Sequence, residues 1–286
     1  LIDFKELKYP SGSGIEYFDG KIYIVGDDAG SILVTNRRWK NREEIILFET
    51  TEARIPKKEK ADLEASAIIQ LDKKTHLLLL GSGSRELRNK GIVYDIAAGE
   101  KTEFDFTVFY NRLKAAGITD LNIEGAAQVN KRLVFCNRGN KTNPGNQVVI
   151  TTPDFFRHQD DAPIELLNIK MPEHEGRIGI SGLAYSEVHD ILLFTTSTED
   201  TKNSVDDGPI GKSYLGVIEN FNWKIAKGKM KVNELIDLSA SDEGFAGYKI
   251  ESVCIQSEKN RSMKIQLVAD NDTGETYLFK AVLEIG

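Results

Sequence analysis

The sequence predicts an all-β protein built as a five-bladed β-propeller, and three observations support this fold. One seven-residue window recurs five times, each copy is followed by further strand-like runs, and an unused N-terminal segment matches a strand missing at the C-terminus. The third residue of the window falls at positions 13, 64, 124, 181 and 251, so successive copies lie 51 to 70 residues apart. Propeller blades repeat at about 40 to 50 residues, so we expect four-stranded blades with enlarged loops.

The repeated window is expected to form the innermost strand of each blade. Its copies begin at Ser11, Asp62, Asn122, Gly179 and Lys249. The third residue is always Glu or Ser. The fourth is always tiny, namely Gly14, Ala65, Gly125, Gly182 and Ser252. Tiny residues let backbones approach one another closely, so the five windows can converge around one central channel.

Each window is followed by a polar turn, a second strand, a polar loop and a third strand, a pattern typical of consecutive antiparallel strands. We expect the second strands at 21–25, 76–80, 132–136, 191–195 and 264–268. The third strands are expected at 31–35, 91–96, 147–151, 212–218 and 275–282. A fourth strand is readable in four units, at 44–48, 102–106, 164–169 and 232–238.

The two ends of the chain predict how the propeller closes. The fifth unit has no fourth strand before the chain ends, while residues 2–9 alternate in polarity and belong to no unit. We therefore expect residues 2–9 to form the outer strand of the last blade, which removes an exposed edge. Residues 109–116, ended by Gly117, form the only clear helix. Residues 1–286 are expected to be a single domain, since a β-sandwich would not repeat one window and an open solenoid would repeat at a more constant step.

Composition excludes several classes of protein. The net charge is -7 and the pI is about 5.3, so the chain lacks the basic surface that a nucleic-acid polymer needs. No apolar run approaches the roughly 20 residues of a membrane span. Cys136 and Cys254 lie in apolar strand patterns, and two buried thiols or a disulfide both remain open. The chain begins at Leu1, so either a leader has been removed or the chain was trimmed, and we expect a secreted or periplasmic protein.

The third residues of the windows form the candidate metal site. These five residues are expected to meet in one layer of the channel: Ser13, Glu64, Glu124, Ser181 and Glu251. Three converging carboxylates repel one another unless some are protonated or a cation lies between them. Calcium takes 6–8 oxygen ligands, whereas zinc prefers His and Cys and magnesium is too small for a wide ring. The alternative is that these side chains only hydrogen-bond neighbouring strand starts around a water-filled channel.

With this ring, the chain resembles the calcium-dependent apyrases, the soluble calcium-activated nucleotidases, which are five-bladed propellers with a central calcium. The family's calcium ligands run Ser, Glu, Glu, Ser, Glu along the chain, which is the order of the five ring residues here. Residues 18–23 are similar to the family's first-blade hairpin, and residues 110–118 resemble its Tyr-Asn-x-Leu-Arg-Ala-Ala-x-Gly segment. Residues 134–138 fall where the family has an apolar strand that ends in arginines. The chain departs at residues 26–30, where the family's Asp-Asp-Arg-Thr-Gly reads Gly-Asp-Asp-Ala-Gly, so one arginine is missing.

The loops between second and third strands open on the same face as the ring, where a small-molecule ligand would bind at the channel mouth. A phosphohydrolase needs a metal, basic groups that hold phosphate oxygens and a carboxylate that accepts a proton from water. From loop position we expect Asp27 or Glu199 to be that carboxylate. The expected substrate-binding residues are Asp28, Arg85, Arg138 and Lys141.

Two hypotheses of function follow. The first is a calcium-dependent phosphohydrolase of nucleotides or related phosphoesters. The second is a non-catalytic propeller that binds a glycan, peptide or small ligand and in which calcium is purely structural. Arg85 and Arg138 discriminate between them, because arginines that project into the channel mouth favour an enzyme and arginines paired with Asp or Glu favour binding. The sequence leaves the oligomeric state open.

Overall fold

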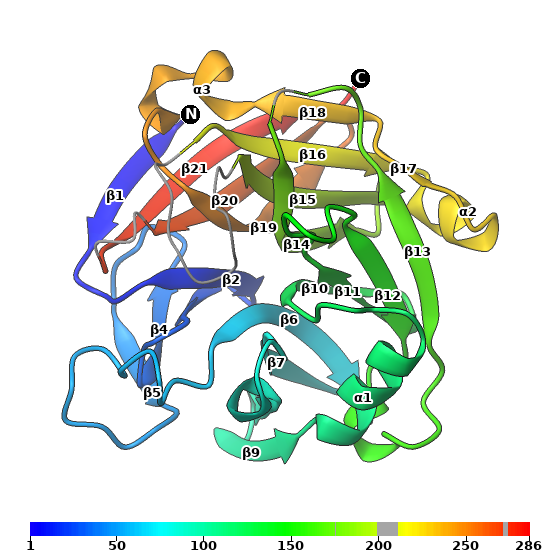
Figure 1. Cartoon of the computed structure of the whole chain (residues 1–286). Helices are drawn as coiled ribbons and strands as arrows, with labels where there is room; N and C mark the ends of the chain where they lie inside the picture. Colours follow the sequence, from blue (N-terminus) through cyan, green and yellow to red (C-terminus); the bar gives the residue numbers. More distant parts are fainter. Residues whose placement is uncertain (175, 199–210, 271–273) are drawn as a thin grey trace.

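A computed structural model of the chain describes residues 1–174, 176–198, 211–270 and 274–286. Five sheets, antiparallel except for one short parallel strand pair, are arranged around a centre (Figure 1), which confirms the predicted five-bladed propeller. The first blade contains β2 (Gly12–Phe18), β3 (Lys21–Gly26), β4 (Ser31–Asn36) and β5 (Glu43–Ile46). The second contains β6 (Leu63–Leu71), β7 (Lys74–Gly81), β8 (Lys90–Asp95) and β9 (Glu100–Asp105).

The other three blades follow the same order along the chain. The third contains β10 (Ile123–Val129), β11 (Arg132–Asn137), β12 (Gln147–Thr151) and β13 (Glu165–Lys170). The fourth contains β14 (Ile178–Ser186), β15 (Ile191–Thr198), β16 (Ser213–Glu219) and β18 (Glu234–Asp237). The fifth contains β19 (Ile250–Lys259), β20 (Ser262–Asp270) and β21 (Thr276–Glu284).

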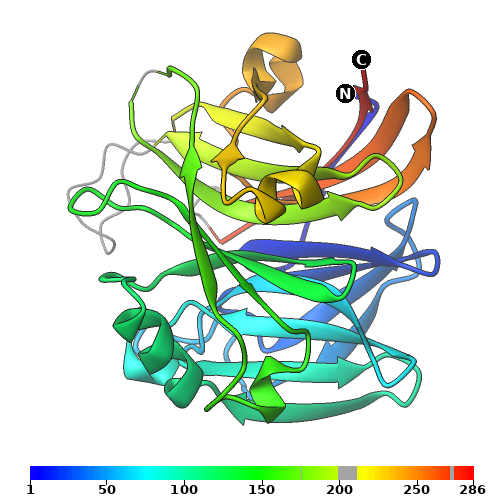
Figure 2. The ribbon, with the colours of Figure 1, turned by 90° about the vertical axis from the view of Figure 1, so that its right-hand side faces the viewer.

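The N-terminal strand closes the fifth blade, as predicted. β1 (Asp3–Leu7) pairs antiparallel with β21, in a register that places Asp3 opposite Lys280 and Leu7 opposite Thr276. In Figure 1 the blue β1 lies beside the red β21, and in Figure 2 the two chain ends lie next to each other. The edge of the last sheet is therefore paired instead of exposed, which is one way in which all-β proteins avoid edge-to-edge association.

The predicted strand at 232–238 is wrong in its bounds. The structure has β17 (Met230–Lys231) followed by β18, which is shorter than the predicted strand. β17 pairs in parallel with β13 of the third blade. Leu238 begins a short helix, α3 (Leu238–Ser241), because the Asp237 side chain accepts a hydrogen bond from Ala240 N and caps it. The sequence also missed α2 (Phe221–Ala226), which buries Phe221 and Ile225.

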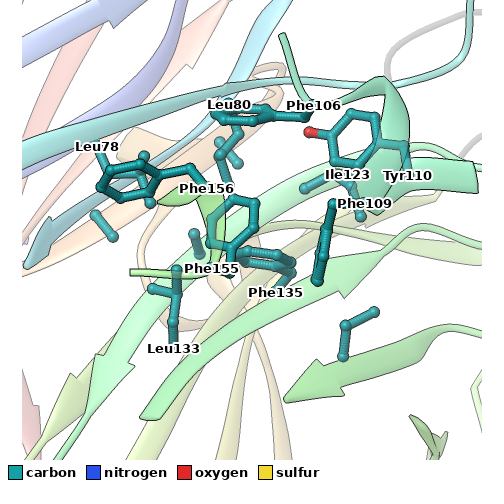
Figure 3. Packing of buried hydrophobic residues seen from close by; sticks show 14 of the residues in the cluster. Leu78, Leu80, Phe106, Phe109, Tyr110, Ile123, Leu133, Phe135, Phe155 and Phe156 are labelled. Carbon is teal, nitrogen blue, oxygen red and sulfur yellow. The ribbon is translucent and has the colours of Figure 1, made fainter. Parts of the chain in front are cut away.

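The hydrophobic core lies between the blades. The predicted helix is α1 (Thr107–Ala115), and it packs where the second and third blades meet. The ring centroid of Phe155 lies 4.6 Å from that of Phe109 on this helix and 5.2 Å from that of Phe135 on β11 (Figure 3). Aromatic pairs at these distances add to the stabilisation from apolar burial. The same cluster includes Leu78 and Leu80 of β7, so α1 packs against both the second and the third blade.

Two further expectations are resolved by the structure. Cys136 and Cys254 are free, buried thiols, so of the two alternatives the disulfide is not formed. Within the described residues, no helix is long and apolar enough to cross a membrane.

The inner strands form a closed circle around the channel. β2 contacts β6, which contacts β10, and the contacts continue through β14 and β19 back to β2. The tiny residue at the fourth window position makes this approach feasible. A Cβ atom on Gly182 would lie 2.6 Å from the Cα of Ser252 on the neighbouring strand.

We predict that Gly182→Ala destabilises the protein by about 1–3 kcal/mol, the usual cost of forcing extra atoms into a packed core. The matched control is Gly145→Ala, because no atom lies within 4 Å of a Cβ at Gly145. Urea unfolding measures both. Equal stability of the two variants would show that the inner strands do not require a tiny residue at this position.

A small cavity of about 150 Å³ lies among the inner strands. All five inner strands contribute to its wall, and Glu16 on β2 is its one carboxylate among the described residues. Burial raises the pKa of Glu16 from its usual value of 4.5 to about 8, although the Ser66 hydroxyl, which donates to Glu16 Oε1 at 2.9 Å, opposes the shift. The side chain is therefore mainly neutral at pH 7.

We predict that Glu16→Gln becomes more stable relative to the parent protein as the pH rises. Because the folded-state pKa is raised, the stability contributed by the neutral acid is complete below about pH 4.5 and is lost as the pH rises toward 8. The expected gain of the variant at pH 8.5 is about 1–3 kcal/mol, measured by urea unfolding from pH 4.5 to 8.5. The exposed Glu100→Gln control should show no such trend. The account would be contradicted if the stability difference between Glu16→Gln and the parent protein stayed the same across this pH range.

Candidate functional site

The five ring residues occupy the same irregularity in every blade. In each inner strand the pairing register shifts across the third window residue, for example between Gly12 and Gly14 in β2 and between Leu63 and Ala65 in β6. The same shift recurs in the other three inner strands. Such a β-bulge leaves one residue outside the regular ladder and re-aims its side chain. Ser13, Glu64, Glu124, Ser181 and Glu251 are therefore equivalent bulge residues.

The two serines of the ring connect adjacent blades. The Ser13 hydroxyl donates to the Leu63 carbonyl oxygen of the second blade at 3.0 Å. The Ser181 hydroxyl lies 3.3 Å from the Ile250 carbonyl oxygen of the fifth blade. These contacts are of the kind expected from the alternative in which the ring side chains hydrogen-bond the starts of neighbouring strands. A serine oxygen that donates its proton still has lone pairs for a cation.

Two of the three ring glutamates have basic partners. Glu124 Oε2 lies 3.3 Å from Arg138 Nη1, and Asn122 Nδ2 donates to Glu124 Oε1 at 2.6 Å. Glu251 Oε1 lies 3.0 Å from Lys249 Nζ. Both glutamates are more than nine-tenths buried, so each buried negative charge is at least partly offset by a protein cation.

The third glutamate lies in a denser cluster of carboxylates. Carboxylate oxygens of Asp27, Asp62 and Glu64 all lie within 4.8 Å of one another. Lys60 forms ion pairs with Asp27 and, at 3.0 Å, with Asp62 Oδ1. Asp62 also accepts from Arg88 Nη1 at 2.7 Å and from the Ser82 hydroxyl at 2.6 Å. The negative charge of Asp62 is therefore better compensated than those of Asp27 and Glu64.

The pKa values in this cluster indicate an excess of negative charge. Burial raises the pKa of Glu64 well above its usual range, and the charges of Asp62, Asp27 and Glu124 raise it further. Burial also raises the pKa of Asp27 to about 6, although Lys60 opposes the shift. Burial lowers the pKa of Lys60, but the negative charges of Glu64 and Asp27 outweigh this effect and raise it above its usual value. A further cation near Glu64 would therefore be stabilised electrostatically.

A cavity of about 330 Å³ lies on the ring face beside this cluster. The loop between β5 and β6 supplies much of its wall. Its lining residues are Ser11, Asp27, Asp28, Arg54, Ile55, Pro56, Lys57, Lys60 and Asp270. The sequence-predicted Asp27 and Asp28 therefore share one cavity, and Arg54 Nε holds Asp28 Oδ2 at 2.6 Å.

The other predicted substrate residues are not brought to this cavity. Arg138 turns to the ring and pairs with Glu124. Arg85 lies exposed at the start of a short 3-10 helix, and Lys141 is exposed on a loop of the third blade. Glu199 lies outside the described residues. The expected set of phosphate-binding groups is therefore not gathered around Asp27.

Sequence reasoning missed three basic residues of the site. Lys60 lies two residues before Asp62, which begins the second window, and Lys249 lies two residues before the ring residue Glu251. This spacing was a usable signal, because residues i and i+2 lie on the same side of an extended chain. Arg54 gave no such signal, since it lies in a long loop whose path is fixed by contacts with the first blade.

Comparisons with known proteins extend this description. No curated protein matches the sequence. A solved structure of glutaminyl cyclase from Myxococcus xanthus is similar over 98% of this chain and 97% of its own, with a TM-score of 0.52 and 11% identity. A GH43 β-1,3-galactosidase solved with galactodeoxynojirimycin is similar over 97% of this chain and 91% of its own, with a TM-score of 0.57 and 12% identity. At such low identity these likenesses show the fold alone.

The match to a sequence family covers nearly the whole propeller. It runs from residue 8, just after β1, to residue 283, near the end of β21. The matching family is not that of the apyrases, so calcium and nucleotide chemistry do not transfer with it. On this match, the chain belongs to the family of unknown function DUF6929.

Proposed function

We propose that this protein is a calcium-binding propeller that holds a small ligand in the cavity on its ring face. The observation that carries the metal proposal is the crowding of Asp27, Asp62 and Glu64, whose oxygens lie within 4.8 Å of one another. Lys60 pairs with Asp27 and Asp62 and opposes the shift, yet the pKa of Glu64 stays well above its usual value. The donor set contains only carboxylate and hydroxyl oxygens, which suit calcium.

The ring would hold the ion through its bulge residues, with Glu64 as the principal carboxylate. Glu124 and Glu251 would contribute alongside their basic partners, and Ser13 and Ser181 would add hydroxyl oxygens. The ion would supply a fixed positive charge that lowers the pKa of Glu64 and connects several blades. Such a role suits a secreted or periplasmic protein, since extracellular calcium modules work at high free calcium.

Ligand binding is better supported than hydrolysis. The arginine that was expected to hold phosphate, Arg138, is engaged by Glu124, and Arg85 and Lys141 are exposed away from the cavity. By contrast, the cavity beside the ring is walled by paired charges and by apolar Ile55 and Pro56, a mixture typical of small-molecule sites.

A calcium-dependent phosphohydrolase similar to the apyrases is the second candidate. It is favoured by Asp27, because a carboxylate with a pKa of about 6 is suited to accept a proton near neutral pH. Arg54 and Lys57 line the same cavity and could contact phosphate oxygens. In this alternative Asp27 would activate water, and these two side chains would replace the expected arginines.

We predict that calcium raises the melting temperature of the protein and that Glu64→Gln removes most of this shift. Calcium at about 100 times its dissociation constant would stabilise the fold by about 2.7 kcal/mol, or several degrees for a domain of this size. Thermal unfolding with calcium and with a chelator measures the effect.

Glu100→Gln serves as the matched control, because Glu100 is exposed and lies on the outer strand β9. It should keep the full calcium shift. The metal proposal fails if calcium leaves the melting temperature of the parent protein unchanged, or if Glu64→Gln responds as strongly as the parent.

We predict no calcium-dependent release of phosphate from nucleoside diphosphates or triphosphates, because the expected phosphate-binding set is not assembled. A colorimetric phosphate assay with calcium, compared with chelator, measures this directly. Calcium-dependent release that disappears in Asp27→Asn but persists in Asp160→Asn, an exposed control, would replace the binding proposal with the phosphohydrolase.

A further inference from the structure

The loop between β4 and β5 is strongly basic, although the protein as a whole is acidic. Residues 36–42 read Asn-Arg-Arg-Trp-Lys-Asn-Arg and contain no acidic residue, whereas the net charge of the chain is -7. The four basic side chains, Arg37, Arg38, Lys40 and Arg42, are exposed. Among the described residues, no carboxylate forms an ion pair with any of them. Their positive charges therefore face water.

This basic loop lies at the end of the first blade that is farthest from the ring. At the ring end of the blade, Gly12 of β2 pairs with Gly26 of β3. At the other end of β3, Lys21 pairs with Asn36, where the loop begins. The length of β3 places roughly 17 Å between these two ends. A site on the loop is therefore separate from the ring and from the cavity beside it.

Trp39 anchors the loop to the fifth blade. Its side chain is buried, and its φ of 57° is a left-handed conformation that is rare for a bulky residue. Trp39 Nε1 donates to Gln266 Oε1 at 2.6 Å, and the Trp39 carbonyl oxygen accepts from Lys5 Nζ at 3.1 Å. Lys280 Nζ lies 4.3 Å from the centroid of the indole ring. A strained backbone of this kind persists where its surroundings determine the conformation.

The Asn36 side chain fixes the turn within the loop. Asn36 Oδ1 accepts from the backbone N–H groups of Arg38 at 2.9 Å and of Lys40 at 3.1 Å. The backbone N–H of Trp39 donates to the Asn36 carbonyl oxygen at 2.9 Å. The loop backbone is thus ordered before any partner arrives. Binding does not have to order it, which lowers the entropic cost of association.

Lysines of the fifth blade add positive charge beside the loop. Lys280 Nζ donates to the Arg37 carbonyl oxygen at 3.0 Å. Burial lowers the pKa of Lys280, and the charges of Lys264 and Arg38 lower it further, although Asp3 opposes the shift. Positive charges thus lie close enough to repel one another, and an anion at this surface would be attracted.

The acidic residues next to the loop do not cancel this charge. Asp3 lies 3.9 Å from Lys280 Nζ and offsets part of the charge of that lysine. Glu43 pairs with Lys21 at 3.6 Å. Glu44 accepts a hydrogen bond from a serine hydroxyl of β4 at 3.0 Å. The basic residues of the loop and of the fifth blade outnumber these three carboxylates, so the local charge is positive.

The arrangement of the basic groups favours a polymer over a small anion. None of the loop residues lines either of the two cavities described above, so a small anion would be exposed to water and held by few groups. A guanidinium can hold two oxygens of a sulfate or carboxylate group at once. A chain with repeated anionic groups can contact several of the four exposed side chains together, and linked contacts strengthen one another.

The buried position of Trp39 narrows the class of polyanion. Single-stranded nucleic acid stacks its bases on exposed aromatic rings, and peripheral membrane binding uses exposed apolar or aromatic side chains. A protein interface has an apolar or aromatic centre. The loop exposes no such side chain. The net charge of -7 also opposes the approach of the whole protein to an anionic membrane. An acidic polysaccharide is a thin chain that can contact the loop alone.

We propose that residues 36–42 bind an acidic polysaccharide, with Arg37, Arg38, Lys40 and Arg42 holding its sulfate or carboxylate groups. The site goes beyond the proposed function, because it lies at the other end of the first blade and requires neither calcium nor a ligand in the cavity.

The test uses a fluorescently labelled heparin octasaccharide and the whole chain. Fluorescence anisotropy at about 50 mM salt should detect binding to the parent protein, and binding should weaken at least tenfold at about 300 mM salt, because salt screens exposed charges. Uncharged dextran of the same length should not compete. Arg37→Gln/Arg38→Gln should weaken heparin binding at least tenfold and leave the melting temperature unchanged, since both side chains are exposed.

The matched control is Lys227→Gln/Lys229→Gln, which removes the same charge from exposed positions of the fourth blade. It should bind heparin within about twofold of the parent protein. Arg42→Gln, at the other end of the loop, is a second variant and should weaken binding several-fold. Glu64→Gln should bind heparin as the parent does even if it removes the calcium shift, which separates this inference from the metal proposal.

Several results would overturn the inference. One is that the parent protein does not bind heparin at about 50 mM salt. Another is that the control loses as much affinity as Arg37→Gln/Arg38→Gln, because the effect would then reflect total charge. A third is that oligothymidylate of matched charge, or vesicles that contain phosphatidylglycerol, bind as tightly as heparin and with the same dependence on Arg37 and Arg38. The loop would then serve a different class of partner.

Discussion

The β-bulge near the start of each inner strand is the constraint on which the rest of the structure depends. It occurs at the same window position in all five blades and takes one residue out of the regular ladder each time. A regular strand would alternate its side chains between the two faces of the blade. Because the bulge interrupts this alternation, a polar residue can occupy the crowded inner strand while its neighbours continue to pack between blades.

The bulge residues create an electrostatic problem that the blades solve unequally. Arg138 and Lys249 lie against Glu124 and Glu251, so these two carboxylates have partners from their own blades. Glu64 lies instead beside Asp27 and Asp62, with Lys60 shared among them. Burial and neighbouring charge therefore combine at one side of the ring, where both the proposed cation and the ligand cavity lie. Charge concentrated in this way is a common feature of functional sites.

Much of the fold was predictable from the sequence because it depends on local patterns that repeat. The window, the strands after it and the pairing of residues 2–9 with the last blade all follow from periodicity and from an uncovered edge. The crossing of Met230 and Lys231 to the third blade was not predictable, because it depends on a contact between distant segments. The short helix that begins at Leu238 was also not predicted. It depends on the cap from Asp237, which interrupts an otherwise strand-like run.

The site was only partly predictable for the same reason. The residue types of the ring follow from the repeated window. The shared position of Asp27 and Asp28 follows from the order of the loops along the chain. The partner of Arg138 does not, because a long basic side chain can reach either the ring or the channel mouth, and only the packed structure decides between them. The contribution of Arg54 depends on how a long loop folds back over the first blade, which no short-range signal encodes.

The central claim is that the bulge residues form a cation site around Glu64. A structure from crystals grown with calcium tests it most directly, through the anomalous difference density in the channel. The account predicts a strong peak beside Glu64 with oxygen neighbours at about 2.3–2.6 Å. It would be contradicted by density for water alone, with Lys60, Arg138 and Lys249 still paired with their carboxylates.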